Sequence, residues 1–137
     1  MKVSLYKRFD NIKPKEEDVY KALDSIKNGT YSELIKNVRF LINDKVARDI
    51  EKKKLPLIGW SGTFLTRSNS KLKKHNGLAC LDFDHLPNVL KTKEEVNKDK
   101  FTFASFISPS GDGLKVLVRI PNVSSDKDYK SFYSELQ

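Results

Sequence analysis

Residues 78–84 form an apolar segment that ends in two aspartates, with the sequence Leu-Ala-Cys-Leu-Asp-Phe-Asp. An apolar run of this length between turn residues predicts a β-strand, and strand side chains alternate between two faces. Asp82 and Asp84 therefore project from one face, while Leu81 and Phe83 point into a core. Two carboxylates close together on a mostly buried strand repel each other and lose hydration. A divalent cation offsets both costs and supports chemistry, so the pair predicts a metal site.

The composition describes a single folded domain with no membrane segment. The chain has 137 residues, of which 38% are hydrophobic, and this suffices to bury a core within one domain, residues 1–137. No apolar stretch approaches the roughly 20 residues that cross a bilayer, and the N-terminus lacks the apolar region of a secretion signal. The one cysteine, Cys80, cannot form an internal disulfide. We therefore expect a cytoplasmic protein without membrane attachment.

The chain is basic, with a net charge of +8 from 26 lysines and arginines against 18 aspartates and glutamates. Such a charge favours polyanionic partners such as nucleic acids or nucleotides, although many lysine-rich proteins bind neither. Positive charge gathers just ahead of the carboxylate strand. We expect possible nucleic-acid contacts from this basic loop, namely from Arg67, Lys71, Lys73, Lys74 and His75.

Residues 1–54 are predicted to be helical. The first helix has Pro14 in its first turn, where a missing backbone N–H costs nothing. A second helix spans residues 31–41. Asn43 or Asp44 caps a third. The apolar residues of this third helix are expected to face inward, namely Val46, Ala47 and Ile50.

Residues 55–137 are predicted to be rich in strands. We expect strands over residues 55–60, 78–83, 101–107 and 114–120. A short helix lies near residues 93–97, and a last helix follows Ser124-Ser125. Helices first and strands later predict an α+β fold, in which a mainly antiparallel sheet is packed by helices.

A glycine-rich segment joins the last two predicted strands, and residues 108–115 read Ser-Pro-Ser-Gly-Asp-Gly-Leu-Lys. The segment predicts a tight hairpin in which Gly111 and Gly113 supply positive φ angles. Small residues and free backbone N–H groups also make a concavity that phosphate oxygens can enter. Lys115 follows the turn in a position to meet a phosphate, and alternation places Arg119 on the same face.

Several other side chains have two interpretations. His75 and His85 flank the carboxylate strand, and each is either solvated, a local hydrogen-bond partner or a metal ligand. Cys80 shares the face of the aspartates, where a small buried side chain is the plainer interpretation. Trp60 and Phe64 pack in a core or stack on bases.

Together these segments resemble the archaeo-eukaryotic primase superfamily, and more narrowly its primase-like family with a VirE N-terminal domain. The resemblance rests on residues 81–86 and 108–118, with further likeness at residues 60–64 and 75–78, so it spans roughly residues 55–121. It implies a primase- or RRM-like core. Domains of that family are usually found ahead of a helicase-type ATPase, on mobile elements.

The resemblance also implies roles for individual residues. Asp82 and Asp84 correspond to the catalytic aspartates that bind Mg²⁺ or Mn²⁺ for nucleotidyl transfer. The superfamily's glycine turn and the basic position after it contact a nucleoside triphosphate, which implicates Ser108, Ser110, Gly111, Gly113 and Lys115, and we add Arg119 as a further nucleotide-binding candidate.

Two positions depart from the superfamily pattern. Lys115 stands where a histidine is usual, and lysine offers a point charge instead of a neutral imidazole. The third metal-binding carboxylate expected on a later strand has no match, because Asp126, Asp128 and Glu135 fall in or near the predicted terminal helix. The sequence is therefore expected to be a fragment of a longer primase-helicase-type protein, or its site lacks one ligand.

The leading hypothesis is a primase- or polymerase-like domain that replicates a mobile element by metal-dependent nucleotidyl transfer. Its partners would be a DNA template, nucleoside triphosphates and a linked or associated helicase. One alternative is a non-catalytic module that binds DNA or nucleotide for such a helicase. Another is a metal-dependent nuclease or phosphohydrolase, for which a carboxylate pair and basic groups also suffice, and a purely structural domain is the fourth interpretation.

Overall fold

The computed structural model describes residues 1–120, apart from the side chain of Asn69, and it has the expected α+β fold. Its strands are β1 (Lys2–Tyr6), β2 (Lys15–Asp18), β3 (Leu57–Gly59), β4 (Gly62–Phe64), β5 (Leu72–His75), β6 (Leu78–Phe83), β7 (Thr102–Ile107) and β8 (Leu114–Arg119). Its helices are α1 (Val19–Lys27), α2 (Ser32–Phe40), α3 (Lys45–Lys52) and α4 (Val89–Val96), with a short 3₁₀ helix η1 (Asn69–Lys71). The helix predicted after Ser124-Ser125 lies outside the described residues.

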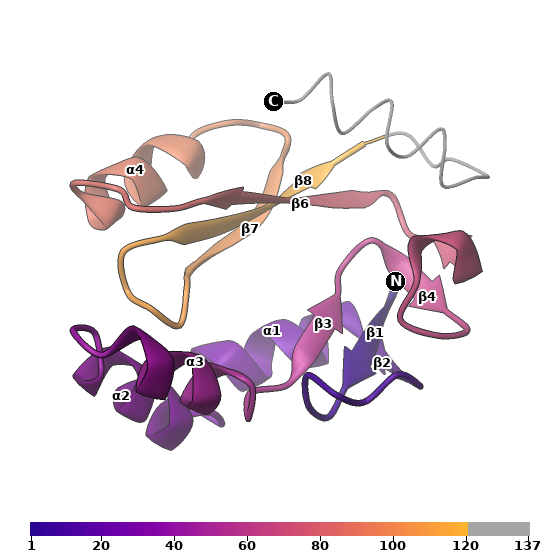
Figure 1. Cartoon of the computed structure of the whole chain (residues 1–137). Helices are drawn as coiled ribbons and strands as arrows, with labels where there is room; N and C mark the ends of the chain where they lie inside the picture. The colour runs from indigo at the N-terminus through magenta and orange to yellow at the C-terminus, as the bar shows by residue number, and fades with distance from the viewer. Residues whose placement is uncertain (121–137) are drawn as a thin grey trace.

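The strands form three small antiparallel sheets (Figure 1). β1 lies between β2 and β3 in the first, β4 pairs with β5 in the second, and β8 lies between β6 and β7 in the third. The expected antiparallel pairing is confirmed, but the strands are divided among three sheets instead of being joined in one. Helices of the described part are all too short or too polar to cross a membrane.

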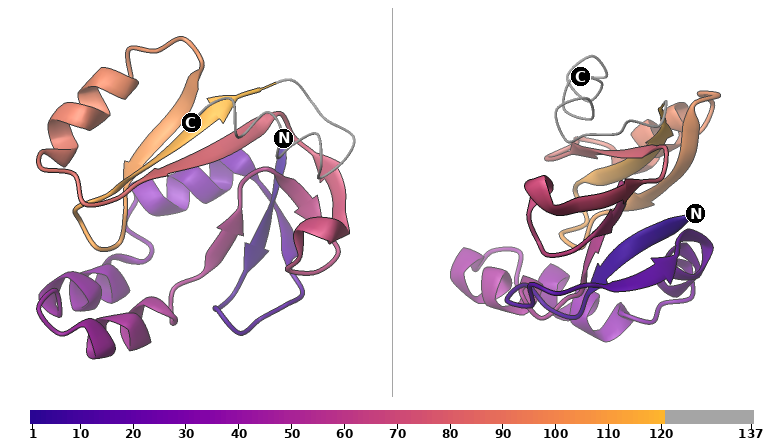
Figure 2. Two further views of the ribbon diagram at one scale, coloured as in Figure 1. Left: turned by 45° about the horizontal axis from the view of Figure 1, so that its top comes forward. Right: turned by 90° about the vertical axis from the view of Figure 1, so that its right-hand side faces the viewer.

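The sheet β6-β8-β7 is covered on both faces, and the side chains of β6 and β8 alternate between these faces in an unbroken register. On one face, Leu78 and Leu117 are fully buried and join a core with residues of β1, α1 and Trp60. On the other face, Ala79, Val116 and their neighbours pack against α4. Figures 1 and 2 show α1 and α4 on opposite sides of this sheet. The alternation predicted for residues 78–83 is therefore confirmed, although Phe83, at the end of β6, is 39% exposed and lies outside the core.

The three helices predicted before residue 54 are present, but the sequence did not reveal the two strands that accompany them. The first helix was expected to include Pro14, yet α1 begins at Val19 because the Asp18 side chain accepts hydrogen bonds from the backbone N–H groups of Tyr20 and Lys21 (3.1 and 3.3 Å). Residues 15–18 instead pair with β1 as strand β2. Their sequence, Lys-Glu-Glu-Asp, has no apolar alternation because β2 is an edge strand with largely exposed side chains.

Helices α2 and α3 form a hairpin that packs chiefly on itself. Asp44 caps α3 as predicted, with its side chain accepting a hydrogen bond from the Ala47 N–H at 3.1 Å. The prediction that α3 turns apolar residues inward is wrong for Val46 and Ile50, which are 74% and 56% exposed. The reason is that no other layer covers the outer side of the hairpin within the described residues.

Candidate functional site

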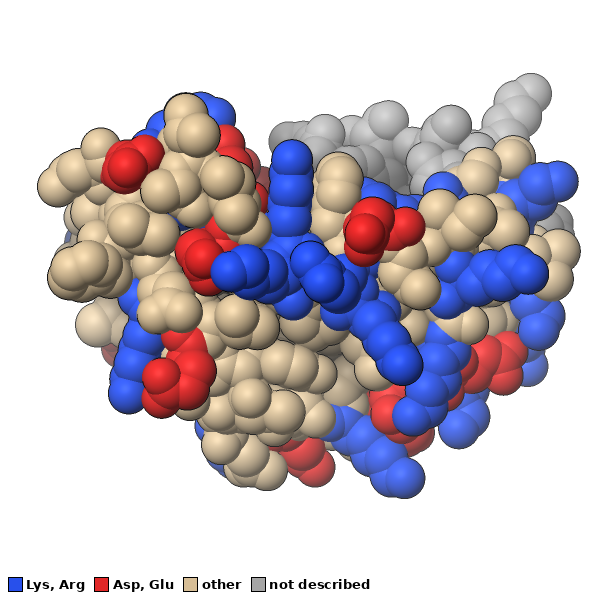
Figure 3. All heavy atoms as spheres, turned by 60° about the horizontal axis from the view of Figure 1, so that its bottom comes forward, with Lys and Arg blue, Asp and Glu red and all other residues tan. Residues whose placement is uncertain are grey.

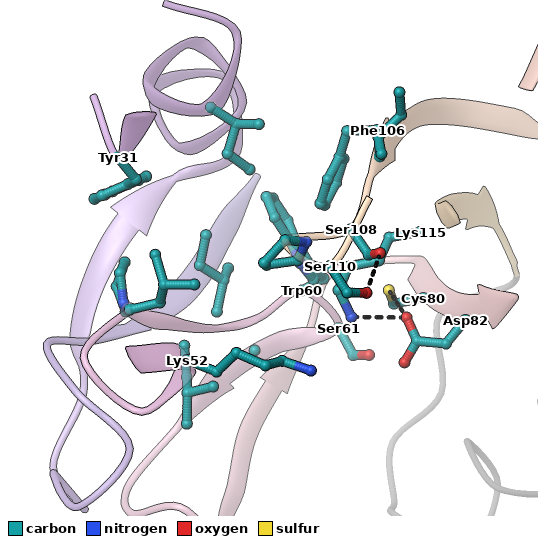
Figure 4. A pocket seen from close by; sticks show the side chains of 18 of the residues that line it. Tyr31, Lys52, Trp60, Ser61, Cys80, Asp82, Phe106, Ser108, Ser110 and Lys115 are labelled. Carbon is teal, nitrogen blue, oxygen red and sulfur yellow. Dashed lines mark hydrogen bonds and ion pairs between the residues drawn. The ribbon is translucent and has the colours of Figure 1, made fainter. Parts of the chain in front are cut away.

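A cleft of about 550 Å³ separates the α2–α3 hairpin and β3 from the sheet β6-β8-β7. Its two ends differ in character (Figure 4). Apolar side chains line the end nearer the helices and its middle, among them Tyr31, Ile35, Leu55, Trp60, Phe64 and Phe106. Polar side chains line the end at the sheet, namely Asp82, Asp84, Ser108, Ser110 and Lys115. The structure therefore brings together five of the predicted site residues in one concave surface.

Asp82 and Lys115 form an ion pair at the polar end of the cleft. The two residues are direct partners in the pairing of β6 with β8, and the Lys115 Nζ lies 2.8 Å from Asp82 Oδ1. Burial alone would lower the pKa of Lys115, but the hydrogen bond and charge of Asp82, with a smaller contribution from Asp84, raise it above its ordinary value. Lys115 is therefore charged at neutral pH and supplies a cation next to the carboxylate pair.

Asp84 follows the last residue of β6 and lines the same cleft as Asp82. It lies against the β7–β8 turn, because a Cβ atom placed on Gly113 would be 3.3 Å from Asp84 Oδ1 and 2.8 Å from Ser108 Oγ. The predicted placement of both carboxylates on one side is confirmed. Among the described residues we find no group of three or more His, Cys, Asp or Glu side chains arranged to hold a metal ion.

The turn between β7 and β8 is the tight hairpin that the sequence predicts. The Ser108 N–H donates to the Gly113 carbonyl at 2.9 Å, and the Gly113 N–H donates to Ser108 Oγ at 3.1 Å. Gly111 has the expected positive φ of 89°, whereas the expectation of a positive φ at Gly113 is wrong. Gly113 is required for a different reason, since any side chain there would collide with Ser108 and the Phe83 carbonyl.

Hydroxyl groups in this turn face one another and the neighbouring carboxylate. The Ser108 and Ser110 Oγ atoms are 3.1 Å apart, and Ser110 donates to Asp112 Oδ1 at 2.9 Å. That hydrogen bond lowers the pKa of Asp112, burial acts against it, and the hydrogen bond and charge of His85 add to the lowering. His85 is exposed in a left-handed conformation (φ 55°), with Nδ1 3.1 Å from Asp112 Oδ2. Its interpretations as a solvated side chain and as a local hydrogen-bond partner therefore both fit.

Arg119 does not reach the cleft, although it shares a sheet face with Lys115. It pairs with Leu78 at the far end of β8, about 13 Å along the strand from Lys115. Its guanidinium lies over the Phe103 ring, 5.1 Å from the centroid, and donates to the carbonyls of Lys100 and Thr102. The structure thus separates Arg119 from the other nucleotide-binding candidates.

The predicted basic loop is spread over the surface beside the cleft, and of its five residues only His75 lines it. His75 is 5% exposed, so its interpretation as a solvated loop residue is wrong, and its Nδ1 accepts a hydrogen bond from the Gly77 N–H at 3.0 Å. Arg67 stacks on the Phe9 ring and donates to the Phe9 carbonyl, and Lys73 pairs with Glu16 at 3.2 Å. Lys71 and Lys74 are exposed. Figure 3 shows lysine and arginine side chains gathered across one face of the molecule.

Cys80 lies on the cleft wall, half-buried, with its Sγ 4.0 Å from Asp82 Oδ1. Burial raises the pKa of the Cys80 thiol to about 12, the charge of Asp82 adds to this, and Lys115 acts in the opposite sense. This shift favours the neutral thiol at physiological pH, and only the thiolate is a nucleophile.

We expect Cys80 to react with iodoacetamide about 1,000-fold more slowly at pH 8 in the folded protein than in urea, because only the thiolate reacts. The chain has one cysteine, so mass spectrometry of the alkylated protein reports this rate without ambiguity. Asp82→Asn is expected to accelerate the folded-state reaction, since it removes a charge that disfavours the thiolate. Equal rates for folded and unfolded protein would contradict this assignment.

Some residues that line the cleft, and one that contacts its turn from outside the lining, were not indicated as functional by the sequence. Tyr31 and Lys52 line the cleft from the ends of the α2–α3 hairpin. Arg39 of α2 donates to the carbonyls of Ser108 and Pro109, which lie 69 and 70 residues away in the sequence. No local pattern indicates contacts at such a separation. Trp60, for which the sequence allowed either core packing or base stacking, is buried in the core and packs on Phe106 with the ring centroids 5.5 Å apart, and both residues also line the cleft.

Comparison with known proteins gives one match. A family model described as BT4734-like, N-terminal domain, matches residues 50–136. No curated protein and no solved structure matches the chain. The matched region contains β6, β7, β8 and the turn between them, so it includes the polar end of the cleft.

Proposed function

This chain belongs to the BT4734-like N-terminal domain family, and we propose that its cleft binds a nucleoside triphosphate together with a divalent cation. The observation that supports this most is the convergence of Asp82, Asp84, the glycine turn and Lys115 on one end of a cleft. Carboxylates suit a hard cation, while serine hydroxyls, backbone N–H groups and a lysine suit phosphate oxygens. An arrangement with both kinds of group side by side fits a metal-bound phosphate.

Asp82 and Asp84 are the residues that would hold the cation. Mg²⁺ and Mn²⁺ prefer oxygen ligands, and Mg²⁺ is commonly bound through one or two carboxylates together with substrate phosphates and water. The donor set of the cleft therefore fits this ion without further protein ligands. When bound, the cation would polarise a phosphoryl oxygen and bring an attacking hydroxyl into line.

Lys115 would contact Asp82 before the ligand binds and a phosphate afterwards. Without a cation, its ammonium group offsets the charge of Asp82 through the 2.8 Å ion pair. A cation at Asp82 would replace that interaction, and the lysine charge would become available to the phosphates held by the turn. Cation binding and phosphate binding would therefore be coupled. A cation at Asp82 would release Lys115 for a phosphate, and a phosphate at Lys115 would release Asp82 for a cation.

The apolar part of the cleft is proposed to hold the base. Trp60, Phe106 and Tyr31 offer ring faces, and stacking on aromatic rings stabilises any base, by about 1–3 kcal/mol for each base. The order of groups along the cleft, apolar rings first and carboxylates last, matches the order of base and phosphates in a nucleotide (Figure 4).

The reaction proposed for this site is nucleotidyl transfer in replication of a mobile element, as the resemblance to the primase superfamily suggests. A DNA template, nucleoside triphosphates and a linked helicase would be the partners, and the protein would act in the cytoplasm. The net charge of +8 supports a nucleic-acid partner. A non-catalytic nucleotide- or DNA-binding module is the second candidate, favoured by the Asp82–Lys115 ion pair that occupies a carboxylate needed for metal.

Calorimetric titration with dATP, in the presence and absence of Mg²⁺, tests the binding proposal. We expect magnesium to strengthen dATP binding at least tenfold, since it would bridge the carboxylates and the phosphates. Extension of a labelled primer on a template then separates the two candidates, because only the transferase lengthens it. Equal dATP affinity with and without magnesium would contradict the metal-bound proposal, and shortening of the primer without dATP would indicate a nuclease.

A further inference from the structure

The α2–α3 hairpin forms a separate wall of the cleft. Its helices pack chiefly on each other, and Val38 is the residue of the two helices that is fully buried. The hairpin joins α1 through Gly29, which has a positive φ of 76°, and it joins β3 through the segment that includes Leu55-Pro56. Figures 1 and 2 show the hairpin at one end of the molecule, beneath the turn between β7 and β8. A wall attached in this way is held in place by few contacts.

Arg39 connects this wall to the turn. Its Nε donates to the Pro109 carbonyl at 3.2 Å, and its Nη2 donates to the Ser108 carbonyl at 3.3 Å. The guanidinium also lies close to the glycine of the turn, since a Cβ on Gly111 would be 3.3 Å from Arg39 Nε. The side chain therefore lies against the segment that the proposed function assigns to phosphate.

The positive charge of Arg39 has no anionic partner in the part of the chain that the structure describes. No carboxylate of residues 1–120 lies within ion-pair distance of its guanidinium, and its acceptors are two neutral carbonyls. Hydrogen bonds to a charged acceptor are about twice as strong as those to a neutral one, and the guanidinium fork matches two phosphate oxygens. A phosphate at the turn would be a better partner than either carbonyl.

We infer that Arg39 binds the phosphate held at Ser108–Gly113, and that the α2–α3 hairpin acts as a lid fixed by this contact. The inference rests on the proposed function, which supplies the phosphate. Tyr31, at the start of α2, and Ile35, within α2, line the apolar part of the cleft. The lid that contacts the phosphate would therefore also cover the base. Arg39 would thereby link occupation of the polar end to closure over the apolar end.

Titration of magnesium dATP into wild type and Arg39→Ala tests this assignment. We expect Arg39→Ala to weaken binding about tenfold and Arg39→Lys to weaken it less, because lysine keeps the charge but loses the fork. Lys36→Ala is the matched control, since Lys36 is exposed on the same helix and, within residues 1–120, pairs with Glu33 alone, at 3.8 Å. Amide hydrogen exchange over residues 32–52 should slow on addition of dATP in wild type and in Lys36→Ala, but not in Arg39→Ala.

Four outcomes would overturn the inference. If Arg39→Ala bound dATP as tightly as wild type, or if the hairpin exchanged equally with and without dATP, the lid contact would not exist. If Arg39→Ala weakened dATP and deoxyadenosine equally, the residue would only support the turn. Wild-type protein that failed to bind dATP at all would overturn the proposed function as well as the lid. The binding of dATP to wild type therefore distinguishes failure of the lid inference alone from failure of both proposals.

Discussion

Replacing both Asp82 and Asp84 with asparagine is expected to weaken the binding of magnesium dATP at least 100-fold. Asparagine keeps the size and shape of each side chain but removes the negative charges that a magnesium ion requires. A 100-fold loss corresponds to about 2.7 kcal/mol of binding free energy. Both carboxylates line the polar end of the cleft next to the turn that we propose to bind phosphate, so their loss would remove the proposed cation together with its bridge to the nucleotide. Calorimetric titration with and without magnesium measures the effect.

The control for this experiment is Asp24→Asn, which removes one exposed carboxylate from α1. It should leave dATP affinity unchanged, which shows that the effect is not one of net charge. Asp82→Asn alone should leave the magnesium-free binding of dATP intact or stronger, because it releases Lys115 from its 2.8 Å ion pair. If the double variant responded to magnesium as wild type does, the two carboxylates would not be the cation site.

Leu117→Ala is expected to destabilise the fold by about 2–5 kcal/mol, the usual cost of removing a fully buried leucine side chain. Leu117 has no exposed surface, and it lies in the middle of β8 in the core that joins the sheet to α1 and Trp60. The free energy of unfolding, measured by urea denaturation, reports the loss. The side chains that would border the resulting cavity belong to paired strands, to α1 and to Trp60 in the turn between β3 and β4.

Leu90→Ala is the matched control for Leu117, because Leu90 lies on α4 and is 65% exposed. We expect it to change the free energy of unfolding by less than about 0.5 kcal/mol, as surface substitutions commonly do. A cost for Leu117→Ala no greater than that for Leu90→Ala would mean that this face of the sheet is not the core. The placement of the cleft against that face would then be wrong too.

The sheet that carries the site was predictable from the sequence because its strands are apolar and alternate. The strands over residues 78–83 and 114–119 have buried side chains on both faces, so their hydrophobic pattern is strong. The pattern also gave the shared face of Asp82 and Asp84, and that of Lys115 and Arg119, correctly. β2 was missed because an exposed edge strand of four charged residues has no such pattern, and local capping by Asp18 then set the start of α1.

Position along a strand and contacts across the chain were not predictable in the same way. Arg119 shares a face with Lys115 but is four residues further along β8, and only the register with β6 shows that it lies beside Leu78 and away from Asp82. The contact of Arg39 with the β7–β8 turn depends on how the hairpin folds back over the sheet, which no local pattern encodes. The burial of His75 similarly results from the pairing of β5 with β4, and the residues next to His75 in the sequence do not indicate it.

We propose above all that Asp82, Asp84 and the turn at residues 108–113 form one site for a cation and a triphosphate. A crystal structure with Mn²⁺ and a non-hydrolysable dATP analogue tests it most directly, because manganese is located by its anomalous scattering. We predict an anomalous peak at about 2.2 Å from carboxylate oxygens of Asp82 and Asp84, with phosphates on the turn and Lys115 displaced from Asp82. Manganese bound elsewhere, or a nucleotide bound while the Lys115–Asp82 ion pair stays intact and the turn stays empty, would contradict the claim.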